Sequence, residues 1–256
     1  MARLTVLGQS GTGKSWATGA LIERALDPRH PLNNGDTFDL AVHFDAEDEE
    51  VGLSDADHDP LFRRLDVDRE LAERIDWPRV IWRYGQVRVV PDMNKEEARH
   101  LYGVICGAVF RIVKDLKPDA TAFVSCDEAG QFVKQNNHHP DVLELQTRGR
   151  KHGAETAHAS QRPQQIHTTM ISESDRRFYF RINDDNAVKK LNAQAGFNTQ
   201  RVPGLGGRGL SDLEDREIVI ENNSTGEIIV EKTDSWNRRR PHYADDDGII
   251  DGVLPV

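Results

Sequence analysis

Short apolar runs alternate with longer amphipathic stretches along most of the chain. Strands are predicted where the apolar run is short, at Arg3–Leu7, Phe38–Phe44, Thr121–Cys126, Thr156–Ser160 and Arg177–Ile182. The third of these is a continuous apolar run, as expected of a strand that is covered on both faces. The pattern therefore predicts a sheet with buried strands.

Amphipathic segments with apolar residues at helical spacing separate these strands. One helix is predicted over Lys14–Leu26, because the prolines that follow it cannot continue a helix. A second begins at Asn94, a good capping residue, and keeps its apolar face as far as Pro118. Shorter helices are predicted at Asp141–Lys151 and Ala187–Ala195.

Two segments are predicted to form hairpins. Val80–Arg83 and Val87–Val90 read as short strands on either side of Gly85, and Arg216–Glu221 and Glu227–Lys232 flank the turn sequence Asn-Asn-Ser-Thr-Gly. The alternation of buried strands with helices predicts an α/β fold. We expect a largely parallel central sheet flanked by helices, followed by a C-terminal β-hairpin.

Length and charge limit the kind of protein this is. A chain of 256 residues can form one large domain, and we expect a core over about residues 1–200, with the hairpin and tail in about 201–256. The net charge of −10 argues against a protein coated for nonspecific DNA binding, although a local basic surface remains open. Many of the acidic residues lie in two segments, Asp45–Asp59 and Asp245–Asp247, and the first of these is predicted to be a solvated loop. Arg238–Arg240 is a short basic run that could contact DNA.

Other features narrow the cellular setting. No apolar run approaches the length needed to cross a bilayer, and the N-terminus enters the fold at once, so neither a transmembrane segment nor a signal peptide is expected. Cys106 and Cys126 lie in apolar surroundings and are expected to be reduced, buried thiols of an intracellular protein. His138 and His139 lack partners at ligand spacing and indicate a polar loop rather than a metal site.

The strongest chemical signal lies between the first strand and the first helix. The segment matches the phosphate-binding pattern G-x-x-x-x-G-K-[ST] without a mismatch. Glycines let backbone N–H groups wrap a phosphate, and the start of the helix favours an anion. Lys14 supplies positive charge to the β- and γ-phosphates, and the Ser15 hydroxyl is placed to bind Mg²⁺. The pattern predicts an ATP and Mg²⁺ site formed by Gly8, Gln9, Ser10, Gly11, Thr12, Gly13, Lys14 and Ser15.

Two later strands end in residues that suit the same site. Asp127 and Glu128 follow the apolar strand Thr121–Cys126, so they are expected at the carboxyl edge of the sheet, where the phosphate loop also lies. Asp127 would hold Mg²⁺, and Glu128 would orient and deprotonate a water molecule. Gln161 ends another strand, where its amide could touch the γ-phosphate and the water. The alternatives are an acidic pair that caps the next helix and an ordinary turn glutamine.

A basic segment, Arg148–His152, ends the helix before that last strand. It could contact nucleic-acid phosphates, or Arg148 or Arg150 could reach the ATP of a neighbouring subunit. The plain alternative is a solvated helix end, where the helix dipole favours cations.

Four segments, in this order and spacing, resemble the FtsK–HerA superfamily of DNA-pumping ATPases. They are GQSGTGKS, FVSCDEAG, TRGRKHG and HASQRP, which together span Gly8–Pro163. The likeness is closest to the genome-packaging ATPases of membrane-containing, double-jelly-roll viruses, including those of archaea. The acidic stretch Asp45–Asp59 is not part of the family pattern, and that pattern constrains the part beyond Pro163 only weakly.

The resemblance implies a RecA-like P-loop fold that works as a homo-oligomeric ring, a hexamer or pentamer, around double-stranded DNA without sequence preference. It implies Lys14 and Ser15 for phosphate and Mg²⁺, Asp127 for Mg²⁺, Glu128 as the catalytic base and Gln161 as the γ-phosphate sensor. Arg148 or Arg150 would act between subunits. The implied setting is the host cytoplasm or a virion vertex, with a capsid vertex or inner-membrane protein as docking partner.

Two other classes of function remain open. A P-loop kinase shares the phosphate loop, but Asp127, Glu128 and Gln161 suit attack by water better than transfer to a second substrate. An assembly factor switched by ATP binding, without hydrolysis or DNA, is the other alternative, and Glu128 argues against it.

Overall fold

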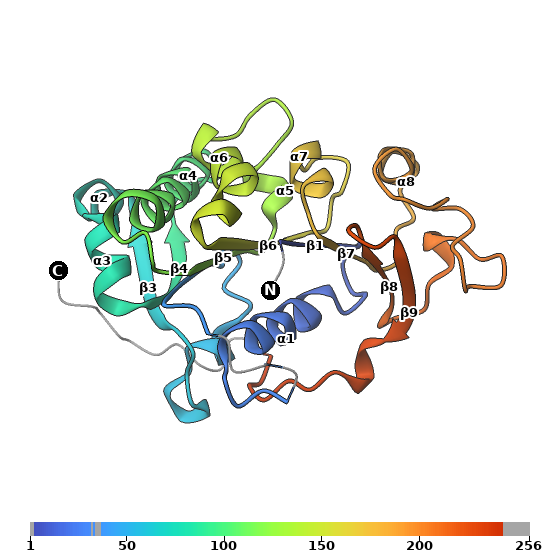
Figure 1. Ribbon diagram of the computed structural model, residues 1–256, viewed down its shortest axis with the longest axis horizontal. Coiled ribbons are helices and arrows are strands. Elements are labelled where there is room, and N and C mark those ends of the chain that lie inside the picture. Colours follow the sequence, from blue (N-terminus) through green and yellow to red (C-terminus); the bar gives the residue numbers. More distant parts are fainter. Residues whose placement is uncertain (1–2, 32, 34–36, 243–256) are drawn as a thin grey trace.

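A computed structural model describes residues 3–31, 33 and 37–242 of the chain. One nine-stranded sheet runs through it in the order β3-β4-β2-β5-β6-β1-β7-β8-β9 (Figure 1). Neighbouring strands from β3 to β7 are parallel, and β8 and β9 continue the sheet as an antiparallel hairpin. The strands are β1 (Leu4–Leu7), β2 (Leu40–Phe44), β3 (Arg63–Asp68), β4 (Gln86–Asp92), β5 (Ala122–Cys126), β6 (Ala154–Ser160), β7 (Arg176–Tyr179), β8 (Glu217–Asn222) and β9 (Glu227–Lys232).

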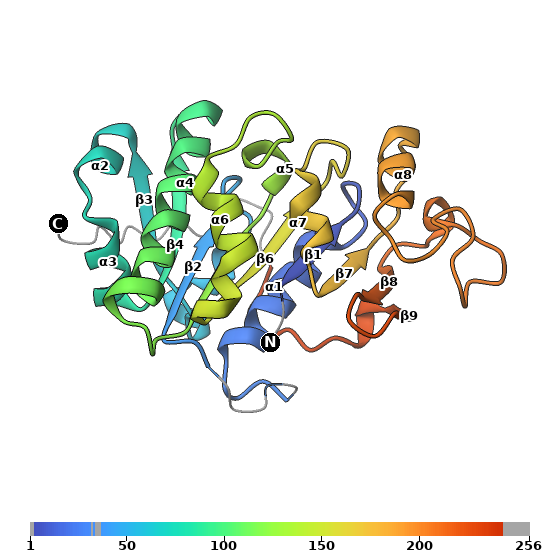
Figure 2. The ribbon, with the colours of Figure 1, turned by 45° about the horizontal axis from the view of Figure 1, so that its top comes forward.

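Helices cover the two faces of this sheet unequally (Figures 1 and 2). On one face α4 packs between α3 and α6, and α6 also contacts α7. On the opposite face α1 lies across the middle strands (Figure 1). The α-helices are α1 (Lys14–Leu26), α2 (Arg69–Arg74), α3 (Trp77–Tyr84), α4 (Lys95–Arg111), α5 (Ala129–Phe132), α6 (Pro140–Arg148), α7 (Thr168–Ser172) and α8 (Asp185–Asn192).

The core lies on both sides of the central strands. Every residue of β2 and β5 is buried, as the continuous apolar run at the second of these predicted. On the α4 side Phe44 contacts Tyr102 and Phe132, with ring centroids 5.1 and 5.3 Å apart. On the α1 side Phe123 belongs to a second apolar cluster. The predicted α/β fold with a largely parallel sheet and a C-terminal hairpin is confirmed.

The predicted hairpin around Gly85 is wrong. Residues Val80–Arg83 belong to α3, in which Trp77 and Ile81 are buried one helical turn apart. The Asp76 side chain caps the helix, and Gly85, with φ of 72°, ends it. The β-branched pair at 80 and 81 suggested a strand, but the helical spacing of the buried residues decides the structure.

Two further differences concern the segment between β2 and β4. β3 and α2 were not predicted, because β3 is an exposed edge strand that buries only alternate residues against β4. The acidic stretch Asp45–Asp59 is not simply solvated, since Asp45 and Glu50 are fully buried. Asp45 is paired with the buried Arg88, 2.7 Å away, which removes the cost of burying its charge alone.

Candidate nucleotide-binding site

The phosphate loop Gly8–Ser15 joins the end of β1 to the start of α1. It is tied to the strands on either side: the Gly8 N–H donates to the Ser160 carbonyl (3.2 Å) and the Gln9 N–H to the Arg181 carbonyl (3.1 Å). The loop therefore lies at the carboxyl edge of the parallel strands, where the sequence placed it.

Two different constraints explain the glycines of this loop. Gly11 and Gly13 have φ of 76° and 94°, a region in which a side chain would be strained. Gly8 packs against the sheet, and a Cβ there would lie 2.4 Å from the Cβ of Phe180. The open shape of the loop and its close approach to β7 both depend on these residues.

The Lys14 ammonium lies between two carboxylates. Its Nζ is 3.3 Å from Oδ1 of Asp127 and 3.3 Å from Oε1 of Glu128, and all three residues are buried. Burial lowers the pKa of Lys14, but the attraction of both carboxylates outweighs burial and leaves this pKa raised. Lys14 is thus held as a cation among carboxylates, ready to exchange them for the more strongly charged phosphates of a nucleotide.

Glu128 has an unusual backbone conformation for a residue with a side chain. Its φ and ψ are 51° and 34°, and its N–H donates to Oδ1 of Asp127 at 2.8 Å. Such a conformation costs about 1–3 kcal/mol and is found mostly at functional sites. Burial, opposed by Lys14 and assisted by Asp127, raises the pKa of Glu128. A carboxylate with a raised pKa is a better proton acceptor at neutral pH.

Gln161 lies at the same edge, as predicted from its position after β6. It is partly exposed, and hydrogen bonding from its amide to Glu128 favours the ionised carboxylate. The structure therefore brings Lys14, Asp127, Glu128 and Gln161 together, from the start of α1 and from the ends of β5 and β6.

Glu49 is a residue of this site that the sequence did not reveal. Its carboxylate interacts with the Ser15 hydroxyl and lies near enough to Asp127 to be repelled by it. The buried Asp45 fixes this part of the chain, because its carboxylate accepts the backbone N–H groups of Glu49 (3.2 Å) and Glu50 (2.9 Å). The sequence signal for Glu49 was its position in the acidic stretch that follows β2. Nothing in the sequence distinguished it from the other acidic residues of that stretch.

The oxygen groups around Ser15 suit Mg²⁺. The Ser15 hydroxyl and the carboxylates of Asp127 and Glu49 are hard oxygen donors, the kind of ligand that Mg²⁺ prefers. Among the residues that the structure describes, no group of three or more His, Cys, Asp or Glu is arranged to hold a metal ion alone. Mg²⁺ is usually held by one or two protein ligands together with the phosphates of the nucleotide.

Arg148 and Arg150 lie away from this site. They end α6 and the short turn before β6 begins, whereas Gln161 follows the end of that strand. The length of β6 separates the two edges by about 20 Å. Both side chains are more than half exposed; Arg148 pairs with Glu144 (2.5 Å) and Arg150 with Asp175 (3.0 Å). Neither can reach a nucleotide held by the same subunit.

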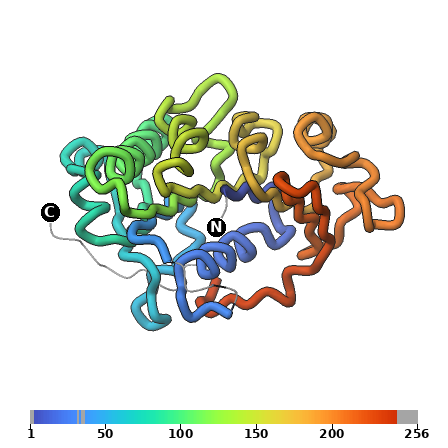
Figure 3. The backbone as a smooth tube through the Cα atoms, in the orientation of Figure 1, coloured from blue at the N-terminus to red at the C-terminus, as the bar shows by residue number. Residues whose placement is uncertain are grey.

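The basic run Arg238–Arg240 is not a free surface for DNA. The chain returns beneath α1 (Figure 3), where Arg238 and Arg240 are buried. Arg238 pairs with Glu50 at 2.5 Å and Arg240 with Asp27 at 3.1 Å. The sequence-based suggestion of a DNA contact is therefore wrong for these two side chains. The acidic partners lie far away in the sequence, so the run looked unpaired.

None of the helices in the described part of the chain is long and apolar enough to span a membrane. No known protein family matches the sequence, and no curated protein matches it either.

Solved structures do resemble this fold. The genome packaging NTPase B204 of Sulfolobus turreted icosahedral virus 2, solved with AMPPCP, gives a TM-score of 0.60 at 13% identity, over 90% of this chain and 96% of that chain. The DNA-packaging ATPase B204 of Sulfolobus turreted icosahedral virus gives 0.55 at 14% identity, over 90% and 97%. EccC (ATPases 2 and 3) of Thermomonospora curvata gives 0.50 at 14% identity, over 96% of this chain and 37% of that chain. At these identities the likeness shows the fold, and it is the fold that the FtsK–HerA resemblance predicts.

Proposed function

We propose that this protein is an ATPase that hydrolyses ATP to ADP and phosphate at the carboxyl edge of its sheet. The observation that carries the proposal is the meeting of Lys14, Asp127 and Glu128 within 3.3 Å beside a complete phosphate loop. The fold likeness to ATPases solved with AMPPCP and ATP-gammaS supports it.

The residues divide the work as their positions suggest. With ATP in the loop, Lys14 leaves the carboxylates and neutralises charge on the β- and γ-phosphates. Mg²⁺, when bound, would be held by Ser15 and Asp127 and would neutralise further phosphate charge. Glu128 accepts a proton from the water that attacks the γ-phosphorus, while the bond to the β-phosphate oxygen breaks. Gln161, beside Glu128, orients that water.

We further propose that hydrolysis drives double-stranded DNA through a homo-oligomeric ring, packaging a viral genome into a preformed capsid. The support is the order of four motifs from the P-loop to HASQRP, together with the fold likeness to two viral packaging enzymes. The ring would work in the host cytoplasm or at a virion vertex, docked on a capsid or inner-membrane protein. The net charge of −10 requires its DNA contacts to be local.

The test is steady-state ATP turnover with and without duplex DNA of random sequence. We expect stimulation that weakens steeply as salt is raised, because phosphate contacts release counterions. If DNA does not change ATP turnover at low salt, in a protein shown to be folded, the proposed DNA translocation is contradicted. Phosphate transfer to an added small molecule would favour a kinase, and ATP binding without turnover would favour an assembly switch.

The ring also gives a role to Arg148 or Arg150, which cannot serve their own subunit. A guanidinium supplied by a neighbour can raise the rate of phosphoryl transfer about 10³–10⁵-fold. Arg148→Ala or Arg150→Ala protein, inactive alone, should regain turnover when mixed with inactive Lys14→Ala protein. Full activity of both arginine variants alone would instead make the segment a solvated helix end or a DNA contact.

A further inference from the structure

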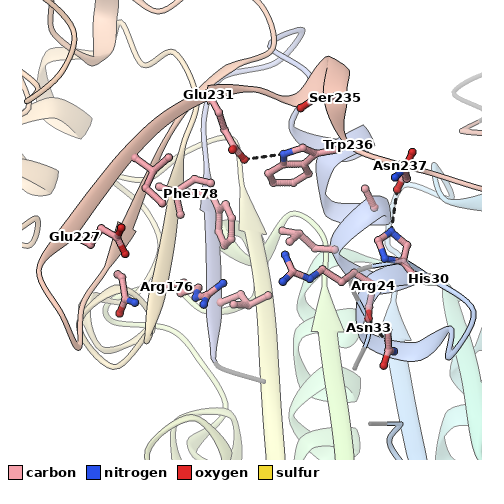
Figure 4. A pocket seen from close by; sticks show the side chains of 16 residues that line it. Arg24, His30, Asn33, Arg176, Phe178, Glu227, Glu231, Ser235, Trp236 and Asn237 are labelled. Carbon is pink, nitrogen blue, oxygen red and sulfur yellow. Dashed lines mark hydrogen bonds between the residues drawn. The ribbon is translucent and has the colours of Figure 1, made fainter. Parts of the chain in front are cut away.

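Residues 236–242, which we call the strap, follow the last strand of the sheet and pass beneath α1 (Figure 3). The first two of them line a pocket on the α1 face of the sheet and make two contacts there (Figure 4). The Trp236 indole donates to the Glu231 carboxylate of β9 at 2.7 Å, and the Asn237 carbonyl lies 3.1 Å from Nε2 of His30. The strap is therefore tied at its start to β9 and to the segment that follows α1.

Arg238 links the strap to two segments that are far apart in the sequence. Its side chain is only 2% exposed. Nη1 donates to the Trp16 carbonyl of α1 at 3.1 Å, and Nη2 pairs with the Glu50 carboxylate at 2.5 Å. Nε donates to the Arg240 carbonyl of the strap itself at 3.0 Å. One buried guanidinium thus joins α1, the acidic stretch Asp45–Asp59 and the strap.

Each of these two partners comes directly after a residue of the nucleotide site. Trp16 follows Ser15 in α1, and Glu50 follows Glu49 in the acidic stretch. The Glu49 carboxylate interacts with the Ser15 hydroxyl. Neighbouring residues are joined by a planar peptide unit, so fixing one of them restricts the other. Arg238 therefore restricts the spacing between the two segments whose side chains meet where Mg²⁺ is expected.

Two glycines make room for the strap. A Cβ on Gly19 would lie 2.4 Å from Nη1 of Arg238, and a Cβ on Gly52 would lie 1.9 Å from the Pro241 carbonyl oxygen. Neither glycine has a positive φ, so the backbone conformation does not require glycine at these positions. A glycine inside a helix costs about 0.5–1 kcal/mol relative to alanine. The close approach of the Arg238 guanidinium explains why α1 carries one there.

The Glu50 carboxylate depends on the strap for its charge partners. It is fully buried, and its Oε1 has no hydrogen-bond partner among the described residues. His242, also in the strap, lies 3.6 Å from that oxygen. A buried carboxylate that loses its cation is left with an uncompensated charge, which favours movement toward water. Because Glu49 is the preceding residue, such a movement would take its carboxylate away from Ser15.

We propose that Arg238 is a positioning residue of the Mg²⁺ site, which holds Ser15 and Glu49 at the spacing that lets both act on one ion. This inference rests on the proposed function of the nucleotide site. Arg238 itself contacts neither the ion nor the nucleotide, because its guanidinium is occupied by Trp16, Glu50 and the strap backbone. Mg²⁺ binding thereby depends on a segment more than 180 positions away in the sequence, since Glu50 and Arg238 are 188 positions apart.

The test measures how tightly a fluorescent ATP analogue binds as the Mg²⁺ concentration is raised. Arg238→Gln should need about 10-fold more Mg²⁺ for tight binding, as is typical when a residue that orients a metal ligand is lost. Gly19→Ala should act in the same direction while it keeps every charge, because the added methyl group displaces the guanidinium. Binding of the analogue without Mg²⁺ should equal that of the wild type, since Lys14 and the phosphate loop remain.

Arg239→Gln is the matched control. Arg239 belongs to the same strap, but its side chain is 40% exposed and pairs with Asp27. Its loss should leave the Mg²⁺ dependence unchanged. Hydrogen exchange of the metal-free protein gives a second measurement: the amides of Glu49 and Glu50, which donate to Asp45, should exchange faster in Arg238→Gln, whereas those of β5 should not.

Chemical denaturation establishes that each variant is folded. A folded Arg238→Gln or Gly19→Ala protein with the Mg²⁺ dependence of the wild type overturns the proposal. An equal change in Arg239→Gln also overturns it, because the effect would then be a general loss of stability. If the wild type itself binds the analogue no better with Mg²⁺ than without it, the proposed nucleotide site is contradicted, and the role of Arg238 fails with it.

Discussion

Two clusters of buried charge pack against α1, and they differ in how their charges are matched. At the start of the helix, Lys14 pairs with Asp127 and Glu128, and Glu49 lies near it. Along the rest of the helix, from Trp16 to Asp27, the arginine cluster of residues 238–240 meets Glu23, Asp27 and Glu50.

In the arginine cluster, Glu23 and Asp27 have several partners each. The Glu23 carboxylate accepts the backbone N–H groups of Arg239 (2.7 Å) and Arg240 (2.8 Å), while both arginine side chains pair with Asp27. Although burial raises the pKa of Asp27, hydrogen bonds from Arg29 and Arg240 lower it further than burial raises it. A matched cluster of this kind stabilises one arrangement of the chain, whereas the unmatched carboxylates near Lys14 leave room for a metal ion and phosphates. The balance of buried charge therefore distinguishes a binding site from a structural contact.

Removal of the Lys14 charge should have the largest effect. We expect Lys14→Ala to abolish ATP turnover, because the developing charge on the phosphates loses its cation. Circular dichroism should show an intact fold. Normal turnover in a folded Lys14→Ala protein would contradict the assignment of the nucleotide site.

Glu128→Gln should separate binding from chemistry. The amide keeps the shape of the side chain but cannot accept a proton, so turnover should fall about 10²–10⁴-fold while a fluorescent ATP analogue still binds. Turnover within a few-fold of wild type would mean that Glu128 has only a structural role at the start of α5.

Loss of an arginine from the arginine cluster should lower the stability of the fold. Arg240→Gln removes one of the cations paired with the buried Asp27, which keeps Arg29 and Arg239, so the free energy of unfolding should fall by about 1–3 kcal/mol. Chemical denaturation measures this loss. Arg148→Gln, at a side chain that is 55% exposed, is the control and should lose less than about 1 kcal/mol. Equal losses in the two variants would show that the buried arginine cluster stabilises the fold no more than an exposed arginine does.

His158 should make the fold sensitive to acid. Burial lowers the pKa of this histidine to about 3, and its Nε2 lies 2.7 Å from the Tyr102 hydroxyl. The unfolded chain takes up a proton near pH 6.5, and the folded protein does not, so stability present at pH 7.5 should fall by about 2 kcal/mol by pH 5.

The measurement is denaturant unfolding at several pH values. His158→Gln should reduce the slope of the profile in this range, to which the buried His43, whose pKa burial also lowers, contributes in the same direction. His100→Gln, at an exposed position, should leave the profile unchanged. A wild-type profile that is already flat between pH 7.5 and 5 would contradict the prediction.

Glu49→Gln should have the smallest effect. If Glu49 orients the Ser15 hydroxyl, its loss should raise the Mg²⁺ concentration needed for tight binding of a fluorescent ATP analogue by about 10-fold. Glu47→Gln is the matched control, because Glu47 is exposed on the same segment and bonds Gln131 instead. Equal Mg²⁺ dependence in both variants would contradict a role for Glu49 in the nucleotide site.

Residue order along the chain determined much of the fold and most of the site. The G-x-x-x-x-G-K-S pattern needs only local geometry, and Asp127 and Gln161 each follow a strand directly. Because parallel strands end at one edge, these local positions predict a shared site without knowledge of the full topology.

The tertiary structure alone decided which of the other charges matter. Glu49 and Glu50 are neighbours in an acidic stretch, yet one faces Ser15 and the other pairs with Arg238, 188 positions away in sequence. Likewise α3 became a helix because Trp77 and Ile81 bury one face, although its residues had suggested strands. The physical reason is the same in each case: pairing of charges and burial of a face depend on which distant segment packs nearby, and the chain specifies that contact only once it is folded.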